Sequence, residues 1–195
     1  MAGIKDVIQS LLTKLATITV TNRDGDSAAL YAHVWNNHVD MEKSGAIETY
    51  PKPAAFIEIG SPVIYENVGL NARAADLNII LHLVHEFYNQ DGTMEQDLEI
   101  FDLRDKVLAA ITGYKPTACG PMVSTSETQD FDHDNVYHFI LQFTCHFIDS
   151  KGSEYDTGRD VYVEKDPPTE LDLQVAIDTE PVFPNIPQQY KIPKQ

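Results

Sequence analysis

Apolar residues recur along this chain with two different periods, and each period predicts a different element. Over residues 4–15 they follow the i, i+3, i+4, i+7 spacing of an amphipathic helix. From Ala75 to Phe87, and again from Val136 to Ile148, apolar and polar residues alternate. Such a period of two is typical of a strand with one buried face and one largely solvent-exposed face.

Shorter patterns supply the other elements. We expect strands over residues 17–21, 28–39, 54–59 and 122–128, an extended segment over 63–67, and a polar loop over 40–53. A second helix is expected from Met94 to Thr112, with Thr93 as its N-cap and Gly113 as its stop. Its predicted inward positions are Leu98, Phe101, Val107, Leu108 and Ile111. The order of elements predicts an α+β fold, an antiparallel β-sheet covered by two α-helices.

The composition changes after about Ser150. Residues 151–195 hold six of the eleven prolines and only short apolar runs, so they cannot form a core of their own. We therefore expect a core domain over 1–150 and an extended, Pro-rich C-terminal arm over 151–195. A floppy terminus is one interpretation. An arm that becomes ordered on a neighbouring subunit is the other, and it is favoured by four candidate anchors: Tyr155, Tyr162, Phe183 and Tyr190.

Charge and cysteine content narrow the classes of function. The 195 residues include 30 acidic and 14 basic ones, which gives a net charge of −16. This argues against a broad nucleic-acid-binding face and against docking on an anionic membrane. Two cysteines make no disulfide framework, and we expect both to be reduced. No signal peptide or apolar run of about 20 residues is evident, so we expect a protein made in the cytoplasm.

The histidines do not suggest a ligand set. On a strand, residues an odd number apart face opposite sides, and residues eight apart lie about 26 Å from each other. Three pairs are excluded as ligands of one ion on these grounds: His82 with His85, His33 with His38, and His138 with His146. Each is expected to be an ordinary strand or surface histidine.

The densest group of potential ligands lies between the last two expected strands. Asp130, Asp132, His133 and Asp134 could hold a divalent cation, which leaves a metal-assisted hydrolase open as an alternative. The run lacks the glycine and closing glutamate of an EF-hand loop, so a solvated turn is the simpler interpretation. No nucleophile elbow, phosphate-binding loop, dinucleotide fingerprint or zinc motif is present. We expect no catalytic residue, no cofactor, no bound metal and no enzymatic activity.

The order of these segments resembles the tail-terminator and tail-completion proteins of long-tailed bacteriophages and prophages. The resemblance covers about residues 1–150 and is a layout rather than a fingerprint. It rests on the following stretches: the helix Ile4–Leu15, the loop and strand Tyr50–Gly60, the long strand Ala75–Phe87, the helix Met94–Thr112, and the strand Val136–Ile148 with the closing Phe147-Ile148-Asp149. The long segment after Ser150 departs from the smaller members.

The resemblance implies a structural role in the virion. Such proteins close into a ring, usually a hexamer, on the last layer of the tail tube, and they join it to neck or connector proteins. DNA would pass through the channel without specific binding, and assembly would take place in the cytoplasm of the host bacterium. A neck, head-completion, tail-tube or baseplate protein remains an alternative, as does a small acidic binding module that mimics nucleic acid.

Overall fold

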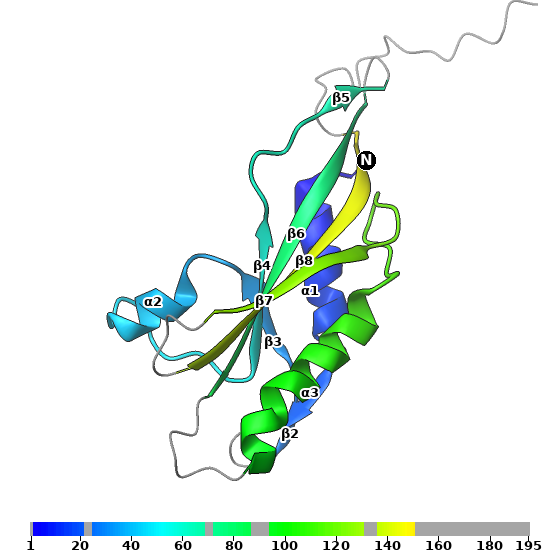
Figure 1. Ribbon diagram of the computed structural model, residues 1–195. Helices are drawn as coiled ribbons and strands as arrows, with labels where there is room; N and C mark the ends of the chain where they lie inside the picture. The colour runs from blue at the N-terminus through cyan, green and yellow to red at the C-terminus, as the bar shows by residue number, and fades with distance from the viewer. Residues whose placement is uncertain (1, 22–24, 69–71, 87–93, 131–135, 151–195) are drawn as a thin grey trace, which may run out of the picture. The chain divides into compact units, whose positions relative to one another are not determined.

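The computed structural model describes residues 2–21, 25–68, 72–86, 94–130 and 136–150 (Figure 1). The chain divides into two units, Met1–Glu154 and Tyr155–Gln195, and every described residue belongs to the first. The expected arm over 151–195 and its four anchors, Tyr155, Tyr162, Phe183 and Tyr190, lie outside the described residues.

The described part is an α+β fold with few helices and a mostly antiparallel sheet, as the sequence predicts at this level. The helices are α1 (Ile4–Leu15), α2 (His38–Lys43) and α3 (Met94–Ile111). The strands are β1 (Thr19–Thr21), β2 (Ser27–Ala29), β3 (Tyr31–Val34), β4 (Ala54–Ile59), β5 (Glu66–Asn67), β6 (Arg73–Glu86), β7 (Val123–Asp130) and β8 (Val136–Asp149). Among the described residues, no helix is long and apolar enough to cross a bilayer.

The main sheet has the strand order β3-β4-β6-β8-β7, with β5 pairing the start of β6, while β1 and β2 form a separate antiparallel pair. One pairing corrects the expectation of an antiparallel sheet, because β3 runs parallel to β4. Between these two strands the chain passes through α2 and a loop, which returns it in the same direction. Parallel neighbours need such a crossover, whereas antiparallel ones can be joined by a tight turn.

The two long strands pair over their full length, from Arg73 opposite Asp149 to Glu86 opposite Val136. This register sets the two faces of the sheet. On β6 the odd-numbered residues from Ala75 to Leu83 point into the main core, and the even-numbered ones point to the second face. The alternation read from the sequence is therefore confirmed for the core face of both strands.

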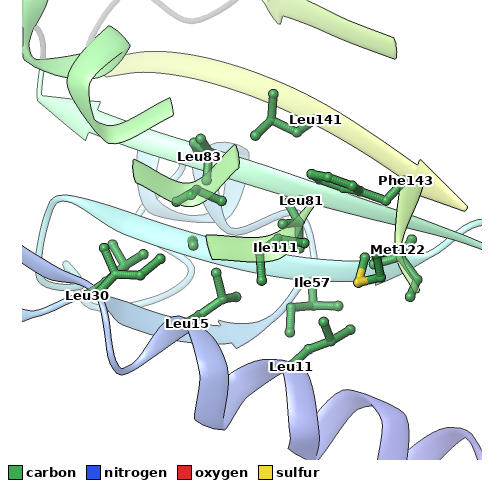
Figure 2. Packing of buried hydrophobic residues seen from close by; sticks show 14 of the residues in the cluster. Leu11, Leu15, Leu30, Ile57, Leu81, Leu83, Ile111, Met122, Leu141 and Phe143 are labelled. Carbon is green, nitrogen blue, oxygen red and sulfur yellow. The ribbon is translucent and has the colours of Figure 1, made fainter. Parts of the chain in front are cut away.

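The main core lies between the first face of the sheet and residues of α1 and α3. Leu11 and Leu15 of α1 approach Ile57 of β4, while Leu81 and Phe143 of the long strands lie beside them (Figure 2). All five side chains are almost fully buried. Burial of such a side chain contributes about 1.5–3 kcal/mol relative to exposure, so this layer supplies most of the stability.

Residues 28–39 do not form the single strand that the sequence suggests. The backbone N–H of Leu30 donates to Ile18, and the buried Leu30 side chain belongs to the main core. The chain then changes partner, since β3 pairs with β4. It turns at Asn37, whose φ of 53° is in the left-handed region that asparagine tolerates.

The predicted loop over 40–53 also needs correction, because α2 begins at His38 and ends at Lys43. Its one buried residue, Val39, packs with Phe56, Val84 and Val136 of the second face. A helix of six residues is too short to show a repeating apolar stripe. The polar sequence therefore predicts a loop, although a single apolar anchor fixes the helix on the sheet.

Helix α3 ends near its predicted residue but buries a different stripe. Ile100, Leu103, Val107 and Ile111 are buried, whereas Leu98 and Phe101 are exposed by 51% and 42%. The inward assignment of Leu98 and Phe101 is wrong, and that of Val107 and Ile111 is confirmed. The stop at Gly113 is confirmed by its φ of +77°. Thr93 lies outside the described residues.

Candidate functional site

Four titratable side chains from four neighbouring strands meet on the second face of the sheet. Asp130 of β7 is paired directly with His138 of β8. His82 of β6 is opposite Ile140, two residues from His138 and on the same face. Glu58 of β4 lies two residues from Phe56, the partner of His82. Diagonal neighbours on one face are within reach of long and aromatic side chains, so the register brings these groups into contact.

The four groups form a continuous series of hydrogen bonds, which we call the histidine chain. Oε2 of Glu58 lies 2.8 Å from Nε2 of His82. Nδ1 of His82 lies 3.0 Å from Nε2 of His138, and Nδ1 of His138 lies 3.0 Å from Oδ2 of Asp130. All three separations are those of good hydrogen bonds. The chain therefore links β4, β6, β8 and β7 in the order in which they lie in the sheet.

The histidine chain is buried in its middle and open at its ends. His82 and His138 are 6% and 3% exposed. The side chains of Glu58 and Asp130 are 39% and 26% exposed. Burial lowers the pKa of His82, because the low-dielectric interior disfavours its charged form, and the hydrogen bond to Glu58 opposes this effect.

The single tryptophan covers the buried histidines. Trp35 stacks on His82 with the ring centroids 3.9 Å apart and the ring planes at 4°. Its centroid is also 5.6 Å from that of His138. The rings of Phe56 and Trp35 meet edge-to-face, with their planes at 62°, and the His38 ring of α2 stacks on Phe56. The aromatic group thereby holds the two imidazoles in one orientation.

Beside this group lies a buried ion pair that fastens α2. Nζ of Lys52 lies 2.7 Å from Oε1 of Glu42, and both side chains are about nine-tenths buried. The Lys52 ammonium also lies over the ring of Tyr50, 4.8 Å from its centroid. Burial, with a smaller contribution from Glu42, raises the pKa of Tyr50. The ion pair keeps the loop after α2 closed on the aromatic residues.

Two open hollows on the surface of the described part lie away from the histidine chain. The larger, of about 300 Å³, is lined by Asp6, Gln9, Ser10, Thr13, Tyr114 and Thr117. The smaller, of about 130 Å³, has His85 and Glu99 among its lining residues, and His85 lies 3.5 Å from Glu99. Drug-sized ligands occupy cavities of about 300–1,000 Å³ that enclose most of their surface, so neither hollow has the shape of a substrate pocket.

The two cysteines are free thiols, as the sequence predicts. Cys145 of β8 is buried, and Cys119 lies beside it, half-buried. A hydrogen bond between the two thiols, together with burial, raises the pKa of Cys119. A thiol in this state is a poor nucleophile, since the thiolate is the reactive form.

The sequence-derived candidates are only partly brought together. Of the acidic run, Asp130 joins the histidine chain, whereas Asp132, His133 and Asp134 lie outside the described residues. Within the described ranges, no three His, Cys, Asp or Glu side chains converge to hold a metal ion.

The exclusion of the three histidine pairs needs one amendment. His82 and His85 do face opposite sides, and His138 and His146 do lie at opposite ends of β8. His33 and His38 are not on one strand, and their rings contact at 6.0 Å. The pair that matters, His82 with His138, is 56 residues apart in sequence and was missed. The segments Ala75–Phe87 and Val136–Ile148 are equally long and alternate in the same way. Pairing them as antiparallel strands with their apolar residues on one face places His82 and His138 together on the other face.

Comparison with known proteins adds no family. A scan against protein-family models and a search of curated proteins both returned no match.

Proposed function

We propose that the chain is a virion structural protein of a phage head–tail junction, resembling a tail terminator. In this proposal about six copies close into a ring that caps the tail tube and joins it to the neck. The core has α1 and α3 over one sheet face, and residues 151–195 form an arm that reaches a neighbouring copy. The role is non-catalytic, and its site is a surface that other proteins contact.

The observation that carries the proposal is the outer edge of the sheet. Strand β7 pairs with β8 on one side, and within the described ranges no strand pairs with it on the other. Its first six residues, Val123–Thr128, are all exposed. An unpaired edge offers a row of backbone donors and acceptors to another chain, and monomeric proteins ordinarily block such an edge. The edge contains Glu127, Asp130 and a bulge between Ser124 and Ser126, but no lysine or proline, so it is only partly protected, which supports a role in assembly.

Apolar residues next to this edge support the same interpretation. Val123 of β7 and Ile148 of β8 point to the second face and are exposed by 54% and 47%. Ile80 and Ile140 on that face are only partly buried. These apolar side chains are interspersed with polar ones on the second face, and such a mixture is found in protein contact surfaces.

The charge is compatible with a channel through which DNA passes. The net charge of −16 arises mostly from residues 1–150. A wall of negative potential repels phosphate, so DNA would move through the ring without being held.

The experiment is a measurement of oligomeric state on the full chain. We expect light scattering coupled to size exclusion to give a discrete species of about six copies, visible as a ring by electron microscopy. Val123→Lys should weaken assembly at least about tenfold, because a charged residue at a strand edge opposes strand addition. Val68→Lys is the matched control, since Val68 is similarly exposed but lies near β5, and it should assemble normally.

Two results would contradict the proposal. One is a monomer at every concentration up to the solubility limit. The other is equal assembly by the Val123→Lys and Val68→Lys variants, which would leave the β7 edge without a role. If a ring forms, capture of tail-tube or neck proteins from a phage lysate would separate a terminator from the other structural proteins of a tail.

A further inference from the structure

The histidine chain contains more hydrogen bonds than two neutral imidazoles can supply. Three hydrogen bonds run in series from Glu58 through His82 and His138 to Asp130, and each requires one proton. A neutral imidazole carries a single ring proton, and an ionised carboxylate carries none. Two neutral rings would therefore leave two bare nitrogens facing each other at 3.0 Å, or one carboxylate without its donor. The three hydrogen bonds can form together only if a third proton is bound.

The contact between the rings has the shape of a hydrogen bond and not of a shared metal ion. The ring centroids are 5.2 Å apart, and the planes are within 22° of each other. If the two nitrogens lie on the line between the ring centroids, the centroid separation equals the 3.0 Å between the nitrogens plus the centroid-to-nitrogen distance of each ring, and the observed value is close to this sum. The two nitrogens thus point straight at each other, which leaves room for a proton on the line between them and none for an ion with ordinary metal–nitrogen distances.

The third proton is best placed on His138. An imidazole is a stronger base than a carboxylate, so the proton belongs to a ring. Each buried ring has a carboxylate and Trp35 beside it: Glu58 at 2.8 Å and the Trp35 centroid at 3.9 Å for His82, Asp130 at 3.0 Å and the Trp35 centroid at 5.6 Å for His138. These contacts stabilise one positive charge on the pair of rings. Burial lowers the pKa of His82, which favours His138 as the ring that bears the charge. His82 then donates Nε2–H to Glu58 and accepts at Nδ1 from Nε2–H of His138.

We propose that the histidine chain is a proton-binding site in which His138 carries a buried positive charge between His82 and Asp130. The bound proton joins the outer strand β7 to the centre of the sheet, because without it the series loses one of its three hydrogen bonds, either the one between the two rings or one to a carboxylate. This site goes beyond the proposed structural role and does not depend on it.

The charged and titratable groups around His138 come from every neighbouring strand. Among the described residues, Glu58 of β4 and Asp130 of β7 are the carboxylates hydrogen-bonded to the two rings, and His82 of β6 is the neutral partner. His38 of α2 contacts the Trp35 ring, and burial, with a smaller contribution from the nearby His33 of β3, lowers the pKa of His38. The histidine chain as a whole then bears a net charge of −1, two carboxylates and one imidazolium.

Proton counting gives the pH dependence with its sign. Unfolded histidines titrate near pH 6.5. Below this pH the unfolded chain binds four protons at the two rings, whereas the folded site binds three, so acid favours unfolding. Above this pH the unfolded chain binds two protons and the folded site still binds three, so alkali also favours unfolding. The contribution of the site to stability is therefore largest near pH 6.5 and falls on both sides.

The direct test is nitrogen-15 NMR of the imidazole rings in the full-length wild-type chain at neutral pH. We expect both His138 nitrogens to have shifts of protonated nitrogen, and one ring proton to couple across the hydrogen bond to Nδ1 of His82. Raising the pH should remove the coupling in one step. A His138 ring with one bare nitrogen at every pH where the protein is folded would overturn the proposal.

Variants test the link to stability. The urea midpoint of unfolding is measured between pH 5.5 and 8.5. In the His138→Gln variant, the stability maximum near pH 6.5 should become flatter than in the wild type. His146→Gln is the matched control, because His146 lies on the same strand and face and also contacts an aspartate, Asp76, but is 60% exposed. It should retain the wild-type profile. The same flattening in both variants would contradict the proposal, and if His138→Gln does not fold, the wild-type NMR result decides.

Discussion

Two leucines of α3 provide a sharp test of how the helix is rotated on the sheet. Leu103 is 3% exposed and Leu98 is 51% exposed, although the sequence pattern assigns Leu98 to the buried stripe. Truncation of a fully buried leucine costs about 3–5 kcal/mol, because transfer free energy is lost and a cavity remains. At Leu98 only about half of the side chain is covered, so Leu98→Ala should cost about 1 kcal/mol or less, and the better helix propensity of alanine reduces it further.

The assay is thermal and urea unfolding followed by circular dichroism. For a chain of this length about 1 kcal/mol shifts Tm by roughly 2–4 °C, so Leu103→Ala should lower Tm by roughly 6–20 °C and Leu98→Ala by roughly 4 °C or less. The measurements should be repeated at several protein concentrations, because self-association would add stability by mass action. A loss for Leu98→Ala as large as that for Leu103→Ala would refute the described rotation of the helix.

Three further predictions follow from single sites. Since burial lowers the pKa of His82, this residue should stay neutral as the pH falls through 6.5. The fluorescence of Trp35, which stacks on His82, should therefore show no quenching transition with a midpoint at pH 6.5. The free energy of unfolding should decrease below pH 6.5, because His82 takes up a proton in the unfolded chain. Gly60→Ala should cost about 1–3 kcal/mol in urea unfolding, since its Cβ would meet the Cβ of Asn78 at 2.9 Å, and the cost should shrink in an Asn78→Gly background. Gly113→Ala should cost about 1 kcal/mol through its φ of +77° alone, in open space, and Asn78→Gly should not reduce that cost.

The parts of the fold that the sequence predicts are those with long, regular periods. Helix α1 begins and ends where its apolar stripe does, and the two long strands lie within two residues of their predicted bounds. Many residues contribute to each of these patterns, so a few exceptions do not obscure them. The one buried anchor of α2, Val39, gives no pattern at all.

The error on α3 has a related cause. Several hydrophobic residues lie on more than one side of this helix, and the period alone does not say which side meets the sheet. The decision comes from contacts with β6 and β8, which place Leu103 and Val107 inward. Phe101 instead lies at the margin, where its ring contacts that of Phe139 edge-on.

The histidine chain shows what a period of two leaves undetermined. Alternation says which face a residue points to, but the partner depends on the register between strands. His82 and His138 meet because Arg73 is opposite Asp149, and a slip of two residues would separate them. The sequence also predicts that this face is largely solvent-exposed, and in water a contact between the two rings would have little effect.

The same face contains a second histidine–carboxylate pair, and the contrast between the two explains where a proton can be held. Nδ1 of His146 lies 3.1 Å from Oδ1 of Asp76, much as His138 lies from Asp130. The outer pair is 60% and 78% exposed, so water competes for both partners and the contact adds little to stability. Around His82 and His138, Trp35 and α2 exclude water, so the protons must be shared among the residues of the histidine chain. A short helix with one buried side chain thus turns an ordinary cross-strand pair into a site.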